Sequence, residues 1–390
     1  MFIHQHYKTP ESGGAIRSYY LAQALIARQV EVEVITAHDE AYQVVNSEKC
    51  TVRYLKVPYN NRYGFIKRSF AFMLFVWKAV SEARKVRDAS LCYAISVPLT
   101  VGIAAVWIKM RYRIPFIFEV GDLWPDVPIQ MGYVQNYFFR QVLLTLEREV
   151  YGAARAVVAL SQPIKEAIEK KVPGKRVFLI PNMADTAYFT MKAKDPVLQA
   201  RLGVEGQFVI SYLGAIGVAN GLDYILSCAH ACGKAALPVR FVIGGDGAHL
   251  ARLKAHALNL GLTNILFLPF MNRQGVEAVM SVTDAVLVCY KPVPILETGS
   301  PHKFFDGLAA GKLVLVNVGG WMSKELAENR CGIGVNPHQP DELIRKIQPF
   351  LADDRLLHEY QQRARRLAES KYSREILGET FYKIIMGERL

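Results

Sequence analysis

Hydrophobic and polar positions form two alternating kinds of segment along the chain. Short apolar runs recur, and between them lie longer stretches in which apolar residues return every three or four positions. The first pattern is typical of buried parallel strands and the second of amphipathic helices. Their regular alternation predicts βαβ units.

The alternation runs through both halves of the chain. The first half is predicted to hold strands at 2–4, 30–35, 116–118, 156–160 and 177–180, and helices at 15–28, 137–151 and 163–171. The second half is predicted to hold strands at 208–213, 239–243, 265–268, 285–289 and 313–316. A break near 181–205 separates them. We therefore predict an α/β protein with two doubly wound domains, 1–183 and 184–371, whose last helix, about 372–390, packs back on the first domain.

Net charge changes the picture in one segment. The chain carries +12, and between Arg53 and Arg113 twelve Lys and Arg residues oppose only Glu82 and Asp88, so this segment supplies +10. Large aromatic residues accompany the charges, a combination that indicates an anionic membrane surface as partner. A solvated face over an ordinary core is the alternative. No nucleic-acid-binding pattern is present, so nucleic acid is not expected as a partner.

Two further observations bear on location. The six cysteines show no metal-ligand spacing, so we expect reduced, buried thiols and a cytoplasmic protein without a signal peptide. The longest uncharged run of the basic segment, 93–108, contains Pro98 and is shorter than a membrane span. A peripheral position on the inner face of the cell membrane follows.

The stretch 297–312 contains the densest group of candidate ligand-binding residues. Ser300 and Pro301 are suited to the N-cap and first position of a helix, whose free backbone N–H groups bind anions. Lys303 adds a cation, and Asp306 adds a carboxylate about one helical turn later. A phosphate-binding group beside a hydroxyl-binding group favours a nucleotide-sugar as ligand.

Other candidates lie at expected strand ends. They are Gly13 and Gly14, Glu119, Asp122 and Asp126, Gly214 and Gly217, and Gly245 and Asp246. Glycines let a phosphate or sugar approach the backbone, and a carboxylate at the end of a parallel strand is placed to orient an acceptor hydroxyl. Plain turns, and helix capping by Asp122 or Asp126, are the structural alternatives.

Taken together, these segments resemble family 4 glycosyltransferases with the GT-B fold. The resemblance covers essentially the whole chain and is carried by residues 10–14, 122–126, 181–182, 214–217, 221–222, 244–247, 300–306 and 309–312. It is closest in character to the bacterial branch that builds capsule, O-antigen and exopolysaccharide. It implies retaining transfer of a sugar, such as an N-acetylated hexosamine, from a UDP-sugar to an undecaprenyl-diphosphate-linked saccharide. It also implies that no metal or other cofactor is required.

The resemblance also implies roles for particular residues. Asp306 would hold the ribose, while Lys303 and the backbone of Gly299 and Ser300 would hold phosphate. The remaining donor-binding residues would be Gly13, Gly14, Gly214, Gly217, Gly245, Asp246, Glu297 and Thr298. The acceptor would meet Asp122, Trp124 and Asp126, and the catalytic residues would be Asp122, Glu119 and Lys303.

The chain departs from the family pattern in two places. Thr298 stands where the family has the first Glu of its E-x7-E pattern, and Ala215 and Asn220 stand where it has Arg and Lys. We expect Lys303 to supply the missing phosphate-binding charge, with Arg273 or Arg17 as a second cation. A UDP-sugar 2-epimerase with two similar domains and a non-catalytic sugar-nucleotide-binding protein are the alternative functions.

Overall fold

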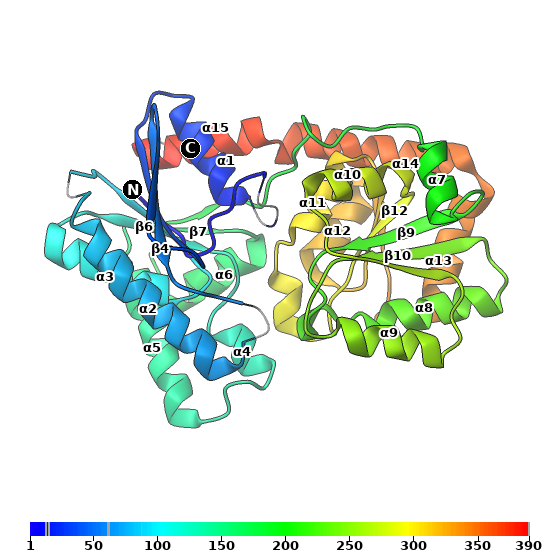
Figure 1. Ribbon diagram of the computed structural model, residues 1–390, viewed down its shortest axis with the longest axis horizontal. Coiled ribbons are helices and arrows are strands. Elements are labelled where there is room, and N and C mark those ends of the chain that lie inside the picture. The colour runs from blue at the N-terminus through cyan, green and yellow to red at the C-terminus, as the bar shows by residue number, and fades with distance from the viewer. Residues whose placement is uncertain (12–13, 15, 61–62, 87, 389–390) are drawn as a thin grey trace.

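The computed structural model describes residues 1–11, 14, 16–60, 63–86 and 88–388, and it contains two α/β domains placed side by side (Figure 1). The N-terminal sheet has the order β3-β4-β2-β1-β5-β6-β7-β8, and only the edge pair β3–β4 is antiparallel. The C-terminal sheet has the order β11-β10-β9-β12-β13-β14, and all its pairs are parallel. This is the two-domain doubly wound arrangement that the alternating pattern predicts.

The N-terminal domain uses the following elements. Its strands are β1 (Phe2–Ile3), β2 (Val32–His38), β3 (Gln43–Ser47), β4 (Cys50–Lys56), β5 (Cys92–Ile95), β6 (Phe116–Val120), β7 (Ala156–Ala159) and β8 (Val177–Leu179). Its helices are α1 (Arg17–Ile26), α2 (Phe65–Ala83), α3 (Thr100–Tyr112), α4 (Asp126–Gln130), α5 (Tyr137–Ala153) and α6 (Gln162–Lys171). Position 15, where the first helix was expected to begin, lies outside the described residues.

The C-terminal domain follows after α7 (Pro196–Leu202). Its strands are β9 (Phe208–Leu213), β10 (Val239–Gly244), β11 (Ile265–Leu268), β12 (Ala285–Val288), β13 (Leu313–Val316) and β14 (Gly332–Gly334). Its helical segments are η1 (Val218–Asn220), α8 (Asp223–Lys234), α9 (Leu250–Asn259), α10 (Arg273–Val282), η2 (Pro294–Thr298), α11 (His302–Ala309), α12 (Gly320–Asn329), α13 (Pro340–Ala352) and α14 (Asp354–Leu367). Several helices start at side chains that accept a backbone N–H, as Asn272 does for α10 and Asp353 for α14.

The last helix returns to the first domain. After η3 (Ala368–Tyr372), Ser373 caps α15 (Arg374–Met386), which packs against α1. Phe381 of α15 is fully buried and lies 4.8 Å from the Tyr93 ring, centroid to centroid, in the N-terminal core. The chain therefore passes between the domains twice, and a backbone bridge between Ala184 and Ser373 joins the two passages.

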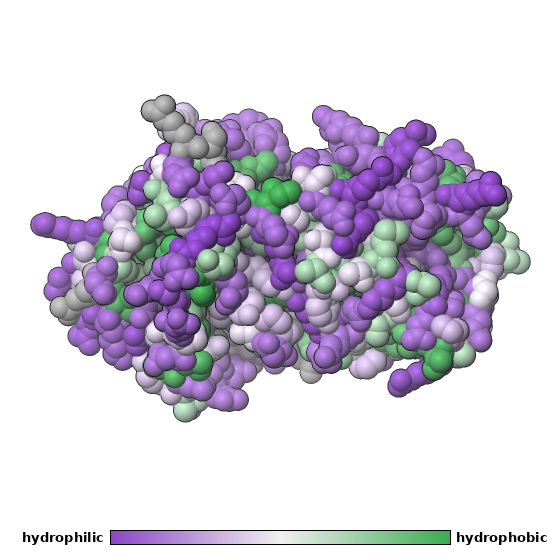
Figure 2. All heavy atoms as spheres, turned by 90° about the horizontal axis from the view of Figure 1, so that it is seen from above, coloured by the Kyte–Doolittle hydropathy of each residue, from purple (hydrophilic) through white to green (hydrophobic). Residues whose placement is uncertain are grey.

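Each sheet is covered on both faces by apolar clusters, which explains why its central strands are uniformly apolar. Four strands escaped the sequence analysis, namely β3, β4, β5 and β14. The edge strand β3 is mostly exposed, and β14 is only three residues long, so neither produces an apolar run. Seen from the side of α15, the surface is mainly hydrophilic with small apolar patches (Figure 2).

Candidate active site

A large cavity lies between the two domains, at the carboxyl ends of both parallel sheets. Its volume is about 1760 Å³. Open α/β sheets place their ligands at this edge, because the strand-to-helix loops there leave room for them. Eight of the predicted residues line the cavity: Gly14, Asp122, Trp124, Gly214, Gly245, Asp246, Lys303 and Asp306. Gly13 lies outside the described residues.

The C-terminal domain contributes Lys303 and Asp306 from the first turns of α11. Lys303 Nζ lies 4.8 Å from the centroid of the Tyr212 ring, and no carboxylate of a described residue lies within ion-pairing distance of it. Burial lowers the pKa of Lys303 to about 8, although Cys289 and Asp306 oppose the shift. Burial also raises the pKa of Asp306 to about 7, against the opposing charge of Arg273. A bound anion would stabilise the charged form of Lys303, and ligand hydroxyls would stabilise the charged form of Asp306.

Two glycine loops pack against each other beside Lys303. Gly214 has φ +149° and Gly245 has φ +144°, values that residues with a side chain rarely adopt. A Cβ atom on Gly245 would lie 1.9 Å from the carbonyl oxygen of Gly214, and one on Gly214 would lie 3.3 Å from Lys303 Nζ. Because Gly214 and Gly245 have no side chains, their two loops pack closely together, and the Gly214 backbone lies beside the Lys303 ammonium at the cavity wall.

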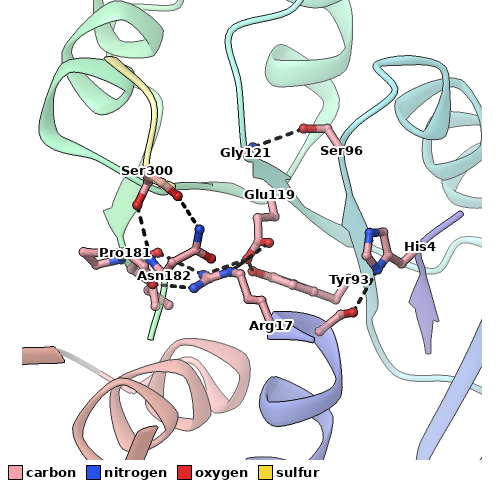
Figure 3. A network of polar contacts seen from close by, with 11 residues as sticks. His4, Arg17, Tyr93, Ser96, Glu119, Gly121, Pro181, Asn182 and Ser300 are labelled. Atoms are coloured by element: carbon pink, nitrogen blue, oxygen red, sulfur yellow. Dashed lines mark hydrogen bonds and ion pairs between the residues drawn. The ribbon is translucent and has the colours of Figure 1, made fainter. Parts of the chain in front are cut away.

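The helix start differs from the prediction for Ser300. The N-cap of α11 is Pro301, and no side chain caps the helix. The Ser300 hydroxyl instead accepts a hydrogen bond from the Asn182 backbone N–H at 3.4 Å, and its carbonyl accepts one from the Asn182 side-chain amide (Figure 3). Ser300 therefore fastens the start of α11 to the linker between the domains, and its side chain does not face the cavity.

The N-terminal domain places Asp122 and Trp124 after β6. The Asp122 carboxylate is exposed to the cavity, and loss of bulk water between the two domains raises its pKa. A Cβ atom on Gly299 would lie 4.0 Å from Asp122 Oδ1, so the carboxylate faces the turn that precedes α11. Of the three acids predicted in this loop region, Glu119, Asp122 and Asp126, only Asp122 lines the cavity.

Glu119 does not have the predicted catalytic position. Its side chain is 1% exposed and binds the Arg17 guanidinium, with an Arg17 Nη2 to Glu119 Oε2 distance of 2.9 Å. The Tyr93 hydroxyl donates a further hydrogen bond to it (Figure 3). Both carboxylate oxygens of Glu119 accept hydrogen bonds from buried groups of the N-terminal domain. Glu119 therefore has a structural position and is not placed to contact a substrate.

Four other predicted residues lie away from the cavity. Asp126 forms an ion pair with Lys171, which also binds Glu147. Thr298 donates its hydroxyl hydrogen to the Ile295 carbonyl at 2.7 Å. Glu297 faces Gly319 and Gly320 at the start of α12, and Gly217 lines a separate cavity of about 370 Å³. In this structure none of these side chains or positions contacts the interdomain cavity.

The two proposed extra cations line the cavity but are already paired. Arg17 donates to Glu119 and to the Ile180 carbonyl at 2.9 Å. Arg273 binds Asp185 and the Tyr20 hydroxyl, and its guanidinium carbon lies 3.8 Å from the centroid of the Tyr188 ring. Lys303 therefore remains the best-placed cation for an anionic ligand.

The Asp185 cluster was missed by the sequence analysis. Tyr20 donates to Asp185 at 2.6 Å, and Arg374 pairs with the same carboxylate at 3.0 Å. These residues come from α1, the linker and α15, so no sequence motif brings them together. His302, the neighbour of Lys303 at the start of α11, also lines the cavity; burial, with help from the charges of Arg17 and Lys303, lowers its pKa to about 4.

The two facing domains and the cleft between them define the class of GT-B glycosyltransferase structures. The likeness to solved structures extends over the whole chain. Sucrose-phosphate synthase from Thermosynechococcus elongatus is 16% identical, with a TM-score of 0.79 over 99% of this chain and 98% of that one. HepE of Anabaena, in complex with UDP and glucose, is 18% identical, with a TM-score of 0.73 over the same shares. At these identities the likeness shows the fold.

The family follows from two domain matches. Residues 12–183 match the glycosyl transferase 4-like domain, and residues 196–367 match the glycosyl transferases group 1 domain. The chain belongs to this glycosyltransferase family. A relative in Escherichia coli (strain K12), the putative colanic acid biosynthesis glycosyl transferase WcaI, is 28% identical over 57% of this chain and 55% of its own length. The matched region thus covers about half the length of that relative.

The buried Arg17–Glu119 pair yields a stability prediction. Arg17→Ala leaves the Glu119 carboxylate buried without its cation, so it should lower the free energy of unfolding by about 3–5 kcal/mol. Urea titration followed by circular dichroism measures the change. The control is Arg252→Ala, which removes an ion pair with Asp223 from a side chain that is 55% exposed and should cost less than about 1 kcal/mol. Equal small losses in both variants would show that the buried pair contributes little.

Proposed function

We propose that the protein transfers a sugar from a UDP-sugar to a lipid-linked saccharide, with retention of the anomeric configuration. The observation that carries the proposal is the juxtaposition of Lys303, Asp306 and the Gly214–Gly245 loops on one wall of the cavity, with Asp122 on the other. Lys303, Asp306 and the glycine loops suit a nucleoside diphosphate, and Asp122 suits an acceptor hydroxyl. HepE, a protein of the same fold, has been solved with UDP and glucose.

The donor site can be assigned residue by residue. The Lys303 ammonium and the backbone near Gly214 would bind the diphosphate, because an ammonium that is partly removed from water gains strongly from an anion. Asp306 would accept hydrogen bonds from the ribose hydroxyls. These groups neutralise the leaving diphosphate without a metal, so we propose a metal-independent reaction.

The transfer itself needs few protein groups. The acceptor oxygen attacks the anomeric carbon as the bond from that carbon to the phosphate oxygen breaks. The proton of the acceptor hydroxyl passes to the departing phosphate oxygen, and UDP leaves. Asp122, which faces the turn before α11, would hold the acceptor hydroxyl on the side of the donor phosphate. Front-side attack of this kind retains the anomeric configuration.

The apolar part of the cavity supports a lipid-linked acceptor. Beyond Trp124, the lining continues over α2, α3 and α5 through apolar side chains: Phe72, Met73, Ile103, Phe139, Leu143 and Leu146. A nucleotide and two sugars do not need such a surface, whereas a prenyl chain does. We propose an undecaprenyl-diphosphate-linked saccharide as acceptor and an N-acetylated hexosamine as transferred sugar, as the family resemblance implies. The relative WcaI is named for colanic acid biosynthesis.

A peripheral position on the inner membrane face completes the proposal. None of the helices in the described part of the chain has the length and apolar content that a membrane span requires. On α2, however, Ile66, Phe70 and Trp77 are 84%, 68% and 68% exposed, and Lys67 lies among them. Exposed aromatic residues also begin α5, at Tyr137 and Phe138. Apolar residues of this size beside cations suit an anionic bilayer surface.

A direct assay tests the function. UDP-, GDP- and TDP-sugars are incubated with and without a polyprenyl-diphosphate saccharide, and products are identified by mass spectrometry. We expect transfer from a UDP-sugar, with kcat/KM lowered about 100-fold by Lys303→Met or Asp306→Asn, because Lys303 would stabilise the leaving diphosphate and Asp306 would hold the ribose of the donor. Isomerisation of a UDP-sugar without acceptor would indicate a 2-epimerase. Binding without turnover would indicate a non-catalytic protein.

The lowered pKa of Lys303 gives a pH prediction for UDP binding. Lys303 titrates near pH 8 in the free protein, so at pH 9 only about a tenth carries the charge that UDP needs. The dissociation constant for UDP, measured by calorimetry, should therefore rise about eightfold from pH 7.5 to pH 9. Lys303→Arg should abolish this rise because arginine stays charged. The same rise in the Lys303→Arg variant would assign it to another group.

Vesicle sedimentation tests the membrane surface. Lys67→Gln combined with Arg84→Gln should weaken binding to vesicles rich in anionic phosphatidylglycerol about tenfold or more, since each cation contributes on the order of 1 kcal/mol. The matched control is Lys324→Gln with Arg345→Gln, which removes equal charge from exposed positions of the C-terminal domain. Equal weakening by both pairs would point to net charge alone and would count against a membrane-binding face.

A further inference from the structure

The N-terminal half of the cavity contains buried polar atoms that have no partner among the described residues. They are both amide atoms of Gln5, Nε2 of His38 and the hydroxyl of Thr100. Gln5, His38 and Thr100 all line the interdomain cavity, and the atoms just named make no hydrogen bond to any described residue. Leaving a polar atom buried and unpaired is unfavourable, so several such atoms at one cavity wall indicate that a ligand completes their hydrogen bonds.

The topology explains why the three residues share one wall. Gln5 follows β1, and its carbonyl accepts from the backbone N–H of Ala37 at 3.3 Å, next to His38 at the end of β2. β1 also pairs with β5, and Thr100 starts the helix that follows β5. The three side chains therefore come from the carboxyl ends of adjacent strands or from the next helix start. Their polar atoms are not the product of a sequence motif, and the sequence analysis missed them.

The surroundings of this wall fit a sugar ring. The Tyr59 ring lies 4.7 Å from the His6 ring and 5.6 Å from the Phe72 ring, centroid to centroid, and all three residues line the cavity. Aromatic faces pack against the C–H surfaces of sugars, while amide, imidazole and hydroxyl groups bond their hydroxyls. A second, charged feature lies nearby, because Lys8 and Arg68 are exposed and line the same cavity.

The position of the wall decides which sugar it would hold. The donor wall, with Lys303 and Asp306, belongs to the C-terminal domain, whereas Gln5, His38 and Thr100 belong to the N-terminal domain. The apolar lining of α2 and α5 is on the N-terminal side as well. A sugar held here would therefore lie on the same domain as the apolar groove, and the donor wall would belong to the other domain. This is the arrangement that a saccharide attached to a lipid requires.

We propose that Gln5, His38 and Thr100 form the hydrogen-bonding subsite for the acceptor sugar and determine which acceptor is used. Rotation about the side-chain bonds turns each group toward a ring hydroxyl or an N-acetyl group of the ligand. Lys8 and Arg68 then bind the acceptor's diphosphate, and the prenyl chain lies along the groove. The proposal rests on the glycosyl transfer proposed above and adds the acceptor residues to it.

The test uses substitutions that remove the unpartnered atoms without opening large cavities. Gln5→Leu and Thr100→Val are assayed with a UDP-sugar and a panel of short-chain polyprenyl-diphosphate saccharides. Each should raise the acceptor KM about five- to tenfold, since a hydrogen bond is lost. The donor KM and the melting shift produced by UDP should stay within about twofold of wild type, because the donor wall is unchanged.

Ser211→Ala is the matched control. The Ser211 hydroxyl is also buried and has no hydrogen-bond partner in the described part of the chain, but it lies in β9 and does not line the cavity. It should leave the acceptor KM unchanged. All three variants should unfold at equal or higher urea concentration than wild type, because loss of an unpaired buried polar atom does not destabilise. A purely structural role for Gln5 or Thr100 would instead lower stability and leave the acceptor KM unchanged.

Two failures are distinguishable. If wild type glycosylates a member of the panel and the acceptor KM is unchanged in Gln5→Leu and Thr100→Val, the subsite is wrong and the function stands. If wild type binds UDP but glycosylates no member of the panel, both the lipid-linked acceptor and this subsite are overturned.

Discussion

The Arg17 guanidinium binds the N-terminal core to the linker where the chain first passes to the C-terminal domain. It occupies a buried position on α1, pairs with Glu119 of β6, and donates to the carbonyls of Ile180 and Pro181 where the chain leaves the N-terminal domain. A buried cation of this kind must have its charge and donors satisfied, so the linker cannot move away without leaving them unpaired. The next residue, Asn182, then binds Ser300 at the start of α11. One chain of contacts thus connects the N-terminal core to the helix that carries Lys303 and Asp306.

The cleft between the connected domains has two chemically different walls. The C-terminal wall is made of glycine backbone, one lysine without an acidic partner among the described residues, and a carboxylate whose pKa is raised by burial. The N-terminal wall offers Asp122, unpartnered amide and hydroxyl groups, and an apolar extension. Under the proposed function, charge neutralisation falls to the C-terminal domain and acceptor selection to the N-terminal domain. The cavity brings the two walls together, and neither domain alone has both.

The sequence predicted the domain pattern well because the buried parallel strands are apolar throughout, and each is followed by a helix. It also located Asp122, Lys303 and Asp306, since each stands at a strand end or helix start where open sheets expose side chains. It failed where a side chain's partner is distant in sequence. Glu119 looked like a neighbour of Asp122, but strand alternation turns it inward to Arg17, which lies 102 positions earlier. Gln5 carries no local signal, because its unpaired amide is visible only when the surrounding elements are assembled.

The central claim is that a nucleoside diphosphate binds against the start of α11, held by Lys303 and Asp306. A crystal structure of the protein with UDP tests it most directly. We predict the diphosphate within hydrogen-bonding distance of Lys303 and the Gly214 loop, and the ribose hydroxyls on Asp306. Density for UDP elsewhere, for example in the smaller cavity beside Arg252 and Lys291, with Lys303 and Asp306 uninvolved, would contradict the account.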